Sequence, residues 1–198
     1  MNKPGLLVCL SSPSGGGKTT ICHRLIDENQ DYQFSVSCTT RPRREHEVDG
    51  VDYHFMDKAE FRNQIESDNL AEYEEVHGNF YGTLKSAVRD ALGRQQVLMV
   101  DIDVKGALSL KKLYEDLCLT IFIQPPSMEV LKERLVGRGT ETESTFNTRM
   151  KRINLEMEYR EQFDKVVINN ALDDAVREVN ALIENKRLTL MEDENYVS

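Results

Sequence analysis

Short apolar runs recur along this 198-residue chain, and stretches with helical spacing separate them. The β-prone runs are Leu6–Leu10, Phe34–Cys38, Val97–Val100, Leu117–Ile123 and Val166–Ile168. Between them, and again near the C-terminus, apolar residues recur every three or four positions, as on one face of a helix. Strands that alternate with helices predict an α/β fold built on a parallel sheet.

Two charged segments interrupt this alternation. The first, from about Cys38 to Leu84, is rich in Tyr and in turn signals, and it predicts a small inserted lobe of mixed α/β structure. The second, from about Arg134 to Arg160, predicts a mobile helical flap, and Ser127 can cap the helix before it. We therefore expect one domain, with a core at about 1–36, 85–126 and 161–198, a lobe at about 37–84 and a lid at about 127–160. The acidic tail, 191–198, is expected to fray.

Charge and cysteine content narrow the class of protein. The formal net charge is -9, so an extended nucleic-acid-binding surface is not expected, and an anionic ligand needs a local cluster of positive charge. The four cysteines lack Cys-x-x-Cys spacing, and Cys9 and Cys118, which lie in apolar runs, are predicted to be buried free thiols, as suits a reducing, cytoplasmic compartment. The first apolar run is too short for a signal peptide, and no run approaches the length of a membrane span.

The most informative motif is a glycine-rich loop between the first predicted strand and a helix over 18–28. It reads Ser12-Pro13-Ser14-Gly15-Gly16-Gly17-Lys18-Thr19, with Ser12 where the usual phosphate-binding loop has its first glycine. Backbone N–H groups of such a loop converge on phosphate oxygens, and the following helix points its positive end at them. Lys18 would contact the transferred phosphates and Thr19 would bind Mg²⁺. An ordinary glycine-rich turn is the alternative.

Asp101 comes directly after the apolar run Val97–Val100. In a phosphate-loop protein, an acidic residue at the end of such a strand contacts the shell of the Mg²⁺ ion. The alternative is a strand that ends in a solvated carboxylate.

The predicted lobe carries a basic cluster, Arg41-Pro42-Arg43-Arg44, on an otherwise acidic chain. Guanidinium groups bind phosphate in a bidentate manner, and tyrosine hydroxyls could complete the anion site. Carboxylates and hydroxyls nearby match guanine, whose N1–H and N2 amine are donors, and they would repel N1 of adenine. The candidates for these two roles are Tyr53 and Tyr81, and Ser37, Glu72, Thr83 and Asp103. Taken singly, each of these residues is better explained as an ordinary surface carboxylate or a helix-capping hydroxyl.

Three arginines of the predicted flap, Arg134, Arg138 and Arg149, could neutralise charge on transferring phosphates. The first two are four residues apart and share one face of a helix. A solvated helix with Glu–Arg pairs is the alternative.

In their order along nearly the whole chain, these motifs resemble the guanylate kinase family, bacterial type, within the P-loop nucleoside monophosphate kinases. The stretches that carry the resemblance are Ser12–Thr20, Ser35–Arg44, Gly50–Phe55, Gly78–Thr83, Asp101–Gly106 and Arg134–Glu141. The resemblance implies a parallel core sheet, a lobe that binds GMP and a lid over ATP. It implies transfer of the γ-phosphoryl group of Mg-ATP to GMP without a general base.

The resemblance also assigns roles to individual residues. ATP would be bound by Ser14, Gly15, Gly16, Gly17, Lys18, Thr19, Thr20 and Asn169, with Asn169 near the adenine. GMP would be bound by Ser37, Arg41, Arg44, Tyr53, Glu72, Tyr81, Thr83 and Asp103. Catalysis would involve Lys18, Arg44, Arg134, Arg138 and Arg149, with the metal at Thr19 and Asp101. No nucleic acid polymer or membrane is expected as a partner, and a homo-oligomer is left open.

Two other functions share these motifs. Guanylate-kinase-like domains of scaffold proteins bind peptides without catalysis, but they typically have a degraded phosphate loop. A kinase for another nucleoside monophosphate is the second alternative, against which Glu72 and Asp103 argue.

Overall fold

The structure of this chain is a computed structural model that describes residues 3–76, 78–136 and 143–196, the last few of them and those around the 137–142 gap by their backbone alone. The described elements build a five-stranded parallel sheet of order β2-β7-β1-β8-β9 and a four-stranded mixed sheet of order β4-β3-β6-β5. The strands are β1 Leu6–Ser11, β2 Tyr32–Phe34, β3 Ser37–Thr39, β4 Tyr53–Phe55, β5 Leu70–Val76, β6 Asn79–Leu84, β7 Val97–Asp101, β8 Cys118–Gln124 and β9 Lys165–Ile168. The α-helices are α1 Lys18–Glu28, α2 Lys58–Glu66, α3 Lys85–Gly93, α4 Val104–Tyr114, α5 Met128–Val136, α6 Glu143–Glu158 and α7 Leu172–Tyr196.

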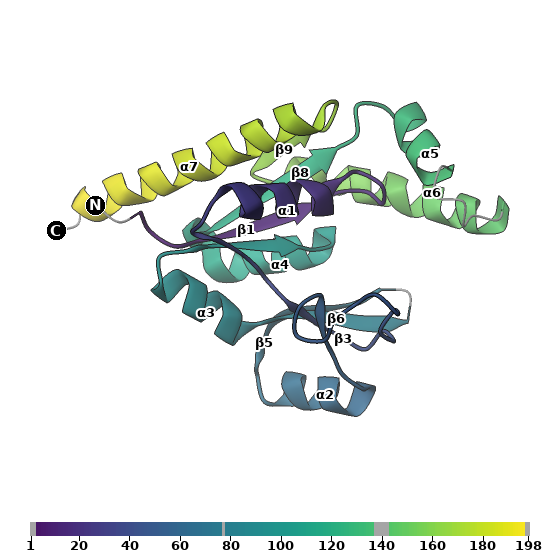
Figure 1. The fold of residues 1–198 in the computed structure, drawn as a ribbon, viewed down its shortest axis with the longest axis horizontal. Helices are drawn as coiled ribbons and strands as arrows, with labels where there is room; N and C mark the ends of the chain where they lie inside the picture. Colours follow the sequence, from purple (N-terminus) through teal and green to yellow (C-terminus); the bar gives the residue numbers. More distant parts are fainter. Residues whose placement is uncertain (1–2, 77, 137–142, 197–198) are drawn as a thin grey trace.

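The parallel sheet lies between two layers of helices (Figure 1). Successive side chains of a strand point to opposite faces of its sheet. On β1, Leu6 and Val8 therefore pack in the apolar cluster that contains α1 and α7, while Leu7 and Cys9 pack in the cluster that contains α3 and α4. Both faces are buried, which explains why β1 reads as a continuous apolar run. The α/β prediction with a parallel sheet is confirmed.

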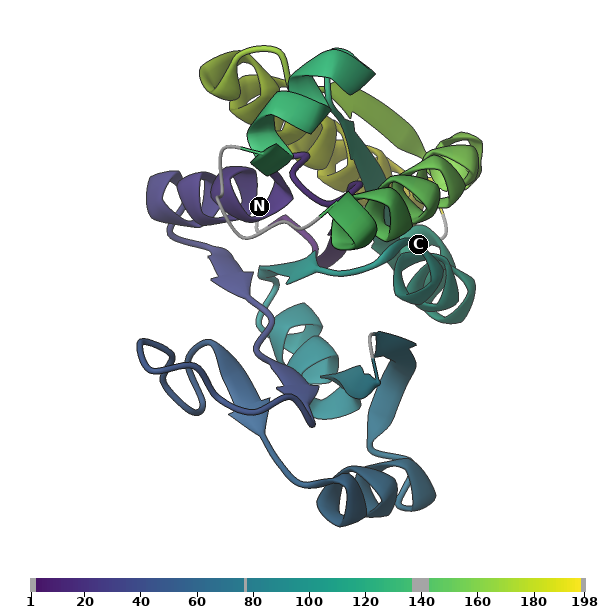
Figure 2. The ribbon, with the colours of Figure 1, turned by 90° about the vertical axis from the view of Figure 1, so that its right-hand side faces the viewer.

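The mixed sheet and α2 form a lobe that lies beside the core (Figures 1 and 2). Its small apolar centre contains Cys38, Phe61 and Leu70. The helix α2 begins with a capping box, in which Asp57 accepts hydrogen bonds from two backbone N–H groups and Glu60 accepts one from the N–H of Asp57. All four strands of this sheet fall within 37–84.

The run Phe34–Cys38 differs from the single strand that the sequence predicts. It contains the end of β2 and the start of β3, which belong to different sheets. The N–H of Ser35 still donates to the carbonyl of Met99, at 2.9 Å, after which the chain leaves the core. The alternation of apolar and polar residues in this segment is typical of a strand, but it does not show that the strand partners change within it.

The helices α5 and α6 carry their own apolar contact between Leu131 and Ile153. As predicted, Ser127 caps α5, its hydroxyl accepting from the N–H of Val130 at 3.3 Å. The last helix, α7, continues through the acidic segment to Tyr196, where fraying was expected. Within the part of the chain that the structure describes, no helix combines the length and the apolar character needed to cross a bilayer.

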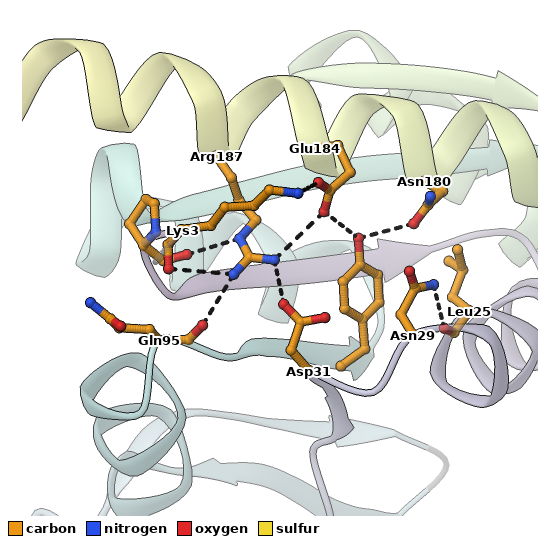
Figure 3. Close-up of polar contacts among 10 residues, drawn as sticks. Lys3, Leu25, Asn29, Asp31, Gln95, Asn180, Glu184 and Arg187 are labelled. Carbon is orange, nitrogen blue, oxygen red and sulfur yellow. Dashed lines mark hydrogen bonds and ion pairs between the residues drawn. The ribbon is translucent and has the colours of Figure 1, made fainter. Parts of the chain in front are cut away.

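A buried arginine on α7 joins distant parts of the core (Figure 3). The side chain of Arg187 is 2% exposed, and its guanidinium lies 2.6 Å from Oδ2 of Asp31. It also donates to the carbonyl oxygens of Pro4, at 2.9 Å, and of Gln95, at 3.1 Å. Arg187 thus connects α7 to the segments that precede β1, β2 and β7.

Replacing this arginine should destabilise the core. In Arg187→Met, the carbonyls of Pro4 and Gln95 lose their donor and the carboxylate of Asp31 loses its partner. We expect the free energy of unfolding to fall by about 2–4 kcal/mol, measured by denaturant titration. The control is Arg177→Met, at an exposed position of the same helix, which should change it by about 0.5 kcal/mol or less. Equal losses in the two variants would contradict a specific role for Arg187.

Candidate active site

The glycine-rich loop connects the end of β1 to the start of α1, as the sequence predicts. Gly15 and Gly17 have φ angles of 89° and 93°, in the left-handed region that side chains disfavour. The N–H of Gly16 donates to the carbonyl of Pro13 at 2.9 Å, which closes the turn. The loop therefore leads directly into the positive end of α1, as an anion site requires.

Asp101 lies beside this loop because of the strand register. In the pairing of β1 with β7, Leu10 is opposite Asp101, so the carboxylate lies at the same sheet edge as the loop. Nζ of Lys18 is 3.1 Å from Oδ1 of Asp101, and the hydroxyl of Thr19 donates to Oδ2. The structure thus brings the ammonium, the hydroxyl and the carboxylate of the predicted phosphate and metal site together.

Asn169 follows β9 and supports the loop from the neighbouring part of the sheet. Its side-chain amide is buried and donates to the carbonyl of Gly16 at 2.9 Å. A Cβ atom on Gly17 would lie 2.4 Å from that amide nitrogen, so the site needs glycine for space as well as for conformation. Contact of Asn169 with adenine remains a prediction.

A cavity of about 680 Å³ joins the loop to the lobe. Residues of the loop region and residues of the lobe line it together, so the two predicted nucleotide sites are continuous. The lining comprises Ser12, Ser14, Lys18, Ser37, Arg44, Tyr53, Glu72, Val76, Tyr81, Gly82, Asp101, Ile102, Asp103, Arg152, Ile153 and Glu156.

Glu72 is the most perturbed carboxyl group in this cavity. It is 8% exposed, and its Oε1 accepts from the hydroxyl of Thr83 at 2.7 Å. Burial raises the pKa of Glu72 to about 7, and the negative charge of Asp103 adds to the effect, while the bond from Thr83 opposes it. Asp103 itself caps α4, its Oδ1 accepting from the N–H groups of Lys105 and Gly106. The carboxylate pair predicted to recognise guanine therefore faces one cavity.

The predicted phosphate clamp is divided by the structure. Arg44, Tyr53 and Tyr81 line the cavity, whereas the guanidinium of Arg41 is paired with the carboxylate of Glu47. Sequence reasoning missed Glu47, although it lies in the same loop as the basic cluster.

Two further lining residues, Arg152 and Glu156, were also missed. They are four apart on α6 and form an ion pair at 2.8 Å, a spacing that is visible in the sequence. Of the predicted flap arginines, Arg138 lies outside the described residues, and the side chains of Arg134 and Arg149 do too. Thr20 is exposed in the first turn of α1.

The raised pKa of Glu72 makes stability depend on pH. Because the folded pKa, about 7, exceeds the ordinary value of 4.5, folding favours the neutral carboxyl group. Its contribution to stability is complete below about pH 4.5 and is lost as the pH rises through about 7. Because glutamine does not titrate, Glu72→Gln has no such loss. Between pH 4.5 and 8 the free energy of unfolding of the unmodified protein should therefore fall by about 3 kcal/mol relative to that of Glu72→Gln.

Denaturant titrations at several pH values test this expectation. The control is Glu75→Gln, at an exposed position of the same strand, which should follow the unmodified protein across the range. Parallel pH profiles for the unmodified protein and Glu72→Gln would show that this carboxyl group does not titrate near pH 7.

Comparison with known proteins agrees with this geometry. The family model of guanylate kinase matches residues 5–186. A guanylate kinase of Chlorobium luteolum is 46% identical over 93% of this chain and 94% of its own length. That of Salinibacter ruber is 50% identical over 87% of this chain and 92% of its own length. The crystal structure of guanylate kinase from Anaplasma phagocytophilum superposes with a TM-score of 0.79 at 28% identity, covering 93% of this chain and 87% of that one. The phosphate loop, the lobe and the cavity between them therefore belong to a protein that is a member of the guanylate kinase family.

Proposed function

We propose that this chain transfers the γ-phosphoryl group of ATP to GMP, which gives ADP and GDP. The observation that carries the proposal is the continuous cavity, which places Lys18 of the phosphate loop and Glu72 of the lobe on the walls of one space. Two nucleotides bound at its two ends would bring their phosphates together between Lys18 and Arg44. Guanylate kinase relatives at 46–50% identity support the same reaction.

The chemistry needs charge neutralisation more than proton transfer. The acceptor is a phosphate monoester, which is largely dianionic near neutral pH because its second pKa is about 6. It can attack without a general base, and the described cavity lining contains no histidine. Repulsion between two anionic groups is the main barrier, and the positive charges of Lys18 and Arg44, which both line the cavity, would lower it.

Thr19 and Asp101 fit a magnesium ion bound together with ATP. Both offer oxygen ligands near the C-terminal ends of the parallel strands β1 and β7. Mg²⁺ commonly takes one or two protein ligands in addition to phosphates and water. Within the described ranges, no group of three or more His, Cys, Asp or Glu residues could hold a metal alone, in keeping with a metal that arrives with its nucleotide. When bound, the ion neutralises charge on the β- and γ-phosphates.

Recognition of guanine follows from Glu72 and Asp103. Ionised carboxylates accept hydrogen bonds from N1–H and the N2 amine of guanine, while N1 of adenine is itself an acceptor and would be repelled. Ser37 also lines the cavity, and its hydroxyl can donate to O6 of guanine. Because Glu72 must be ionised for this role, guanine binding would draw its pKa down from about 7.

The test is ADP production from Mg-ATP with GMP, AMP, CMP, UMP or no acceptor. Strong turnover with GMP alone is expected. Turnover with a different monophosphate would keep the kinase and overturn the recognition of guanine by Glu72 and Asp103. If folded protein binds ATP and no acceptor is phosphorylated, a binding module in the manner of the scaffold domains becomes the better interpretation.

Removing the ammonium group of the loop should abolish transfer without unfolding the protein. In Lys18→Ala we expect kcat with GMP to fall by about 100-fold or more, because one preorganised charge at the transferred group is lost. The melting temperature should stay close to that of the unmodified protein. Lys112→Ala, at an exposed position on α4, is the control and should retain full turnover. Near-normal kcat in Lys18→Ala would remove Lys18 from the reaction.

A further inference from the structure

The loop between β3 and β4 contains a buried ion pair that the proposed reaction does not yet use. Nη1 of Arg41 donates to Oε2 of Glu47 at 2.9 Å, and Nη2 donates to Oε1 at 2.6 Å. The two side chains are 15% and 7% exposed, so the pair is largely withdrawn from water. A planar guanidinium held at two points has a fixed orientation, unlike a single-point contact at the surface.

The same carboxylate also fixes the backbone of Arg44. Oε2 of Glu47 accepts from the N–H of Arg44 at 2.8 Å, and the N–H of Glu47 donates to the carbonyl of Arg44 at 3.1 Å. Arg44 lines the cavity between the loop and the lobe. One carboxylate therefore sets the positions of two arginines, and only Arg44 extends from this loop to the cavity wall.

Arg41 in turn lies against the aromatic wall of the cavity. Its guanidinium carbon is 5.3 Å from the ring centre of Tyr53 and 5.7 Å from that of Phe55. The rings of Tyr53 and Tyr81, which both line the cavity, are 6.0 Å apart and meet edge to face. Because Arg41 is held in place by Glu47, its contact with the ring of Tyr53 has a fixed geometry.

We infer that Glu47 is a positioning residue for the acceptor phosphate: it holds Arg41 against the ring of Tyr53 and directs Arg44 into the cavity. This inference rests on the proposed function, since it assigns the part of the cavity beside Arg44 to the phosphate of GMP. Nη1 of Arg41 also donates to the carbonyl of Pro42 at 2.8 Å, so acceptors of its own loop already hold this guanidinium before any ligand arrives.

The charge of Glu47 persists at every pH at which the enzyme would be assayed. Its hydrogen bonds with Arg41 hold the pKa of the carboxyl group at about 2, far below the ordinary value of 4.5. The ion pair between Glu47 and Arg41 is therefore present at every pH of the assay. A neutral side chain at position 47 occurs only in a variant.

The experiment compares Glu47→Gln with Glu45→Gln. Both remove one negative charge from the same loop, but Glu45 is exposed and Glu47 is buried. Glutamine keeps the size of glutamate and cannot accept at both oxygens, so the two-point contact is lost. We expect KM for GMP to rise about tenfold or more in Glu47→Gln, with KM for ATP unchanged and the melting temperature within a few degrees. Glu45→Gln should behave as the unmodified protein.

Inhibition by a second ligand, guanosine, distinguishes an effect on phosphate binding from an effect on binding of the base. Guanosine carries guanine without the phosphate, so its inhibition constant should be the same in Glu47→Gln and the unmodified protein. Glu47→Asp keeps the charge on a shorter side chain and should recover part of the loss in KM. If Glu47→Gln fails to fold, Glu47→Asp carries the same comparison of GMP, ATP and guanosine.

Three results would overturn the inference. An unchanged KM for GMP would show that the pair does not position the phosphate site. A lower KM would show that Glu47 competes with the phosphate for Arg41. Equal losses for GMP, ATP and guanosine would show a general effect on the fold. Failure of the proposed function is distinguishable from all three, because the unmodified protein would then show no turnover with GMP.

Discussion

The register of two parallel strands determines where the chemistry of this protein can occur. With Leu10 opposite Asp101, β1 and β7 end at the same edge of the sheet. The glycine-rich loop after β1 and the carboxylate of Asp101 therefore lie next to each other. Both strands are buried on both faces, and a shift of one residue would exchange the side chains that pack in the two apolar clusters. The position of Asp101 against Lys18 and Thr19 is thus fixed by packing in the core.

The second half of the site is held less tightly by apolar contact and more by polar pairs. The apolar centre of the lobe is small, with Cys38, Phe61 and Leu70 as its buried members. Its polar groups are positioned by hydrogen bonds instead: Thr83 holds Glu72 in the cavity wall, and Glu47 holds Arg41 against Tyr53. Under the proposed function, these groups are oriented before GMP binds, which lowers the cost of reorganisation during reaction.

Features that depend on neighbouring residues could be predicted from the sequence, whereas features that depend on contacts between distant segments could not. The helix after the glycine loop was predicted with its observed bounds, because loop, cap and apolar spacing are local signals. The position of Asp101 beside the glycine loop agrees with its predicted place at the end of an apolar strand, and its contact with a metal stays a prediction. The split of Phe34–Cys38 between two sheets was not predicted, since strand partners are chosen by the whole fold.

The polar partners of buried arginine side chains were the most difficult feature to predict from the sequence. Binding of the GMP phosphate by Arg41 stays a prediction, and nothing in its spacing from Glu47 shows that the two side chains form an ion pair. Arg187 resembles any helical surface arginine in the sequence, and only the assembled core shows its carbonyl partners. In both cases the missing information is three-dimensional: which polar groups are left without water when the chain closes.

The contacts of Arg187 also have a consequence for how the chain folds during synthesis. The apolar face of the sheet that packs on α1 is covered in part by α7, which leaves the ribosome after every other described element. Until α7 emerges, that face and the segments before β1, β2 and β7 lack their final partner. The native core thus closes only once α7 has been synthesised, and until then the nascent chain exposes an apolar surface of the kind that chaperones bind.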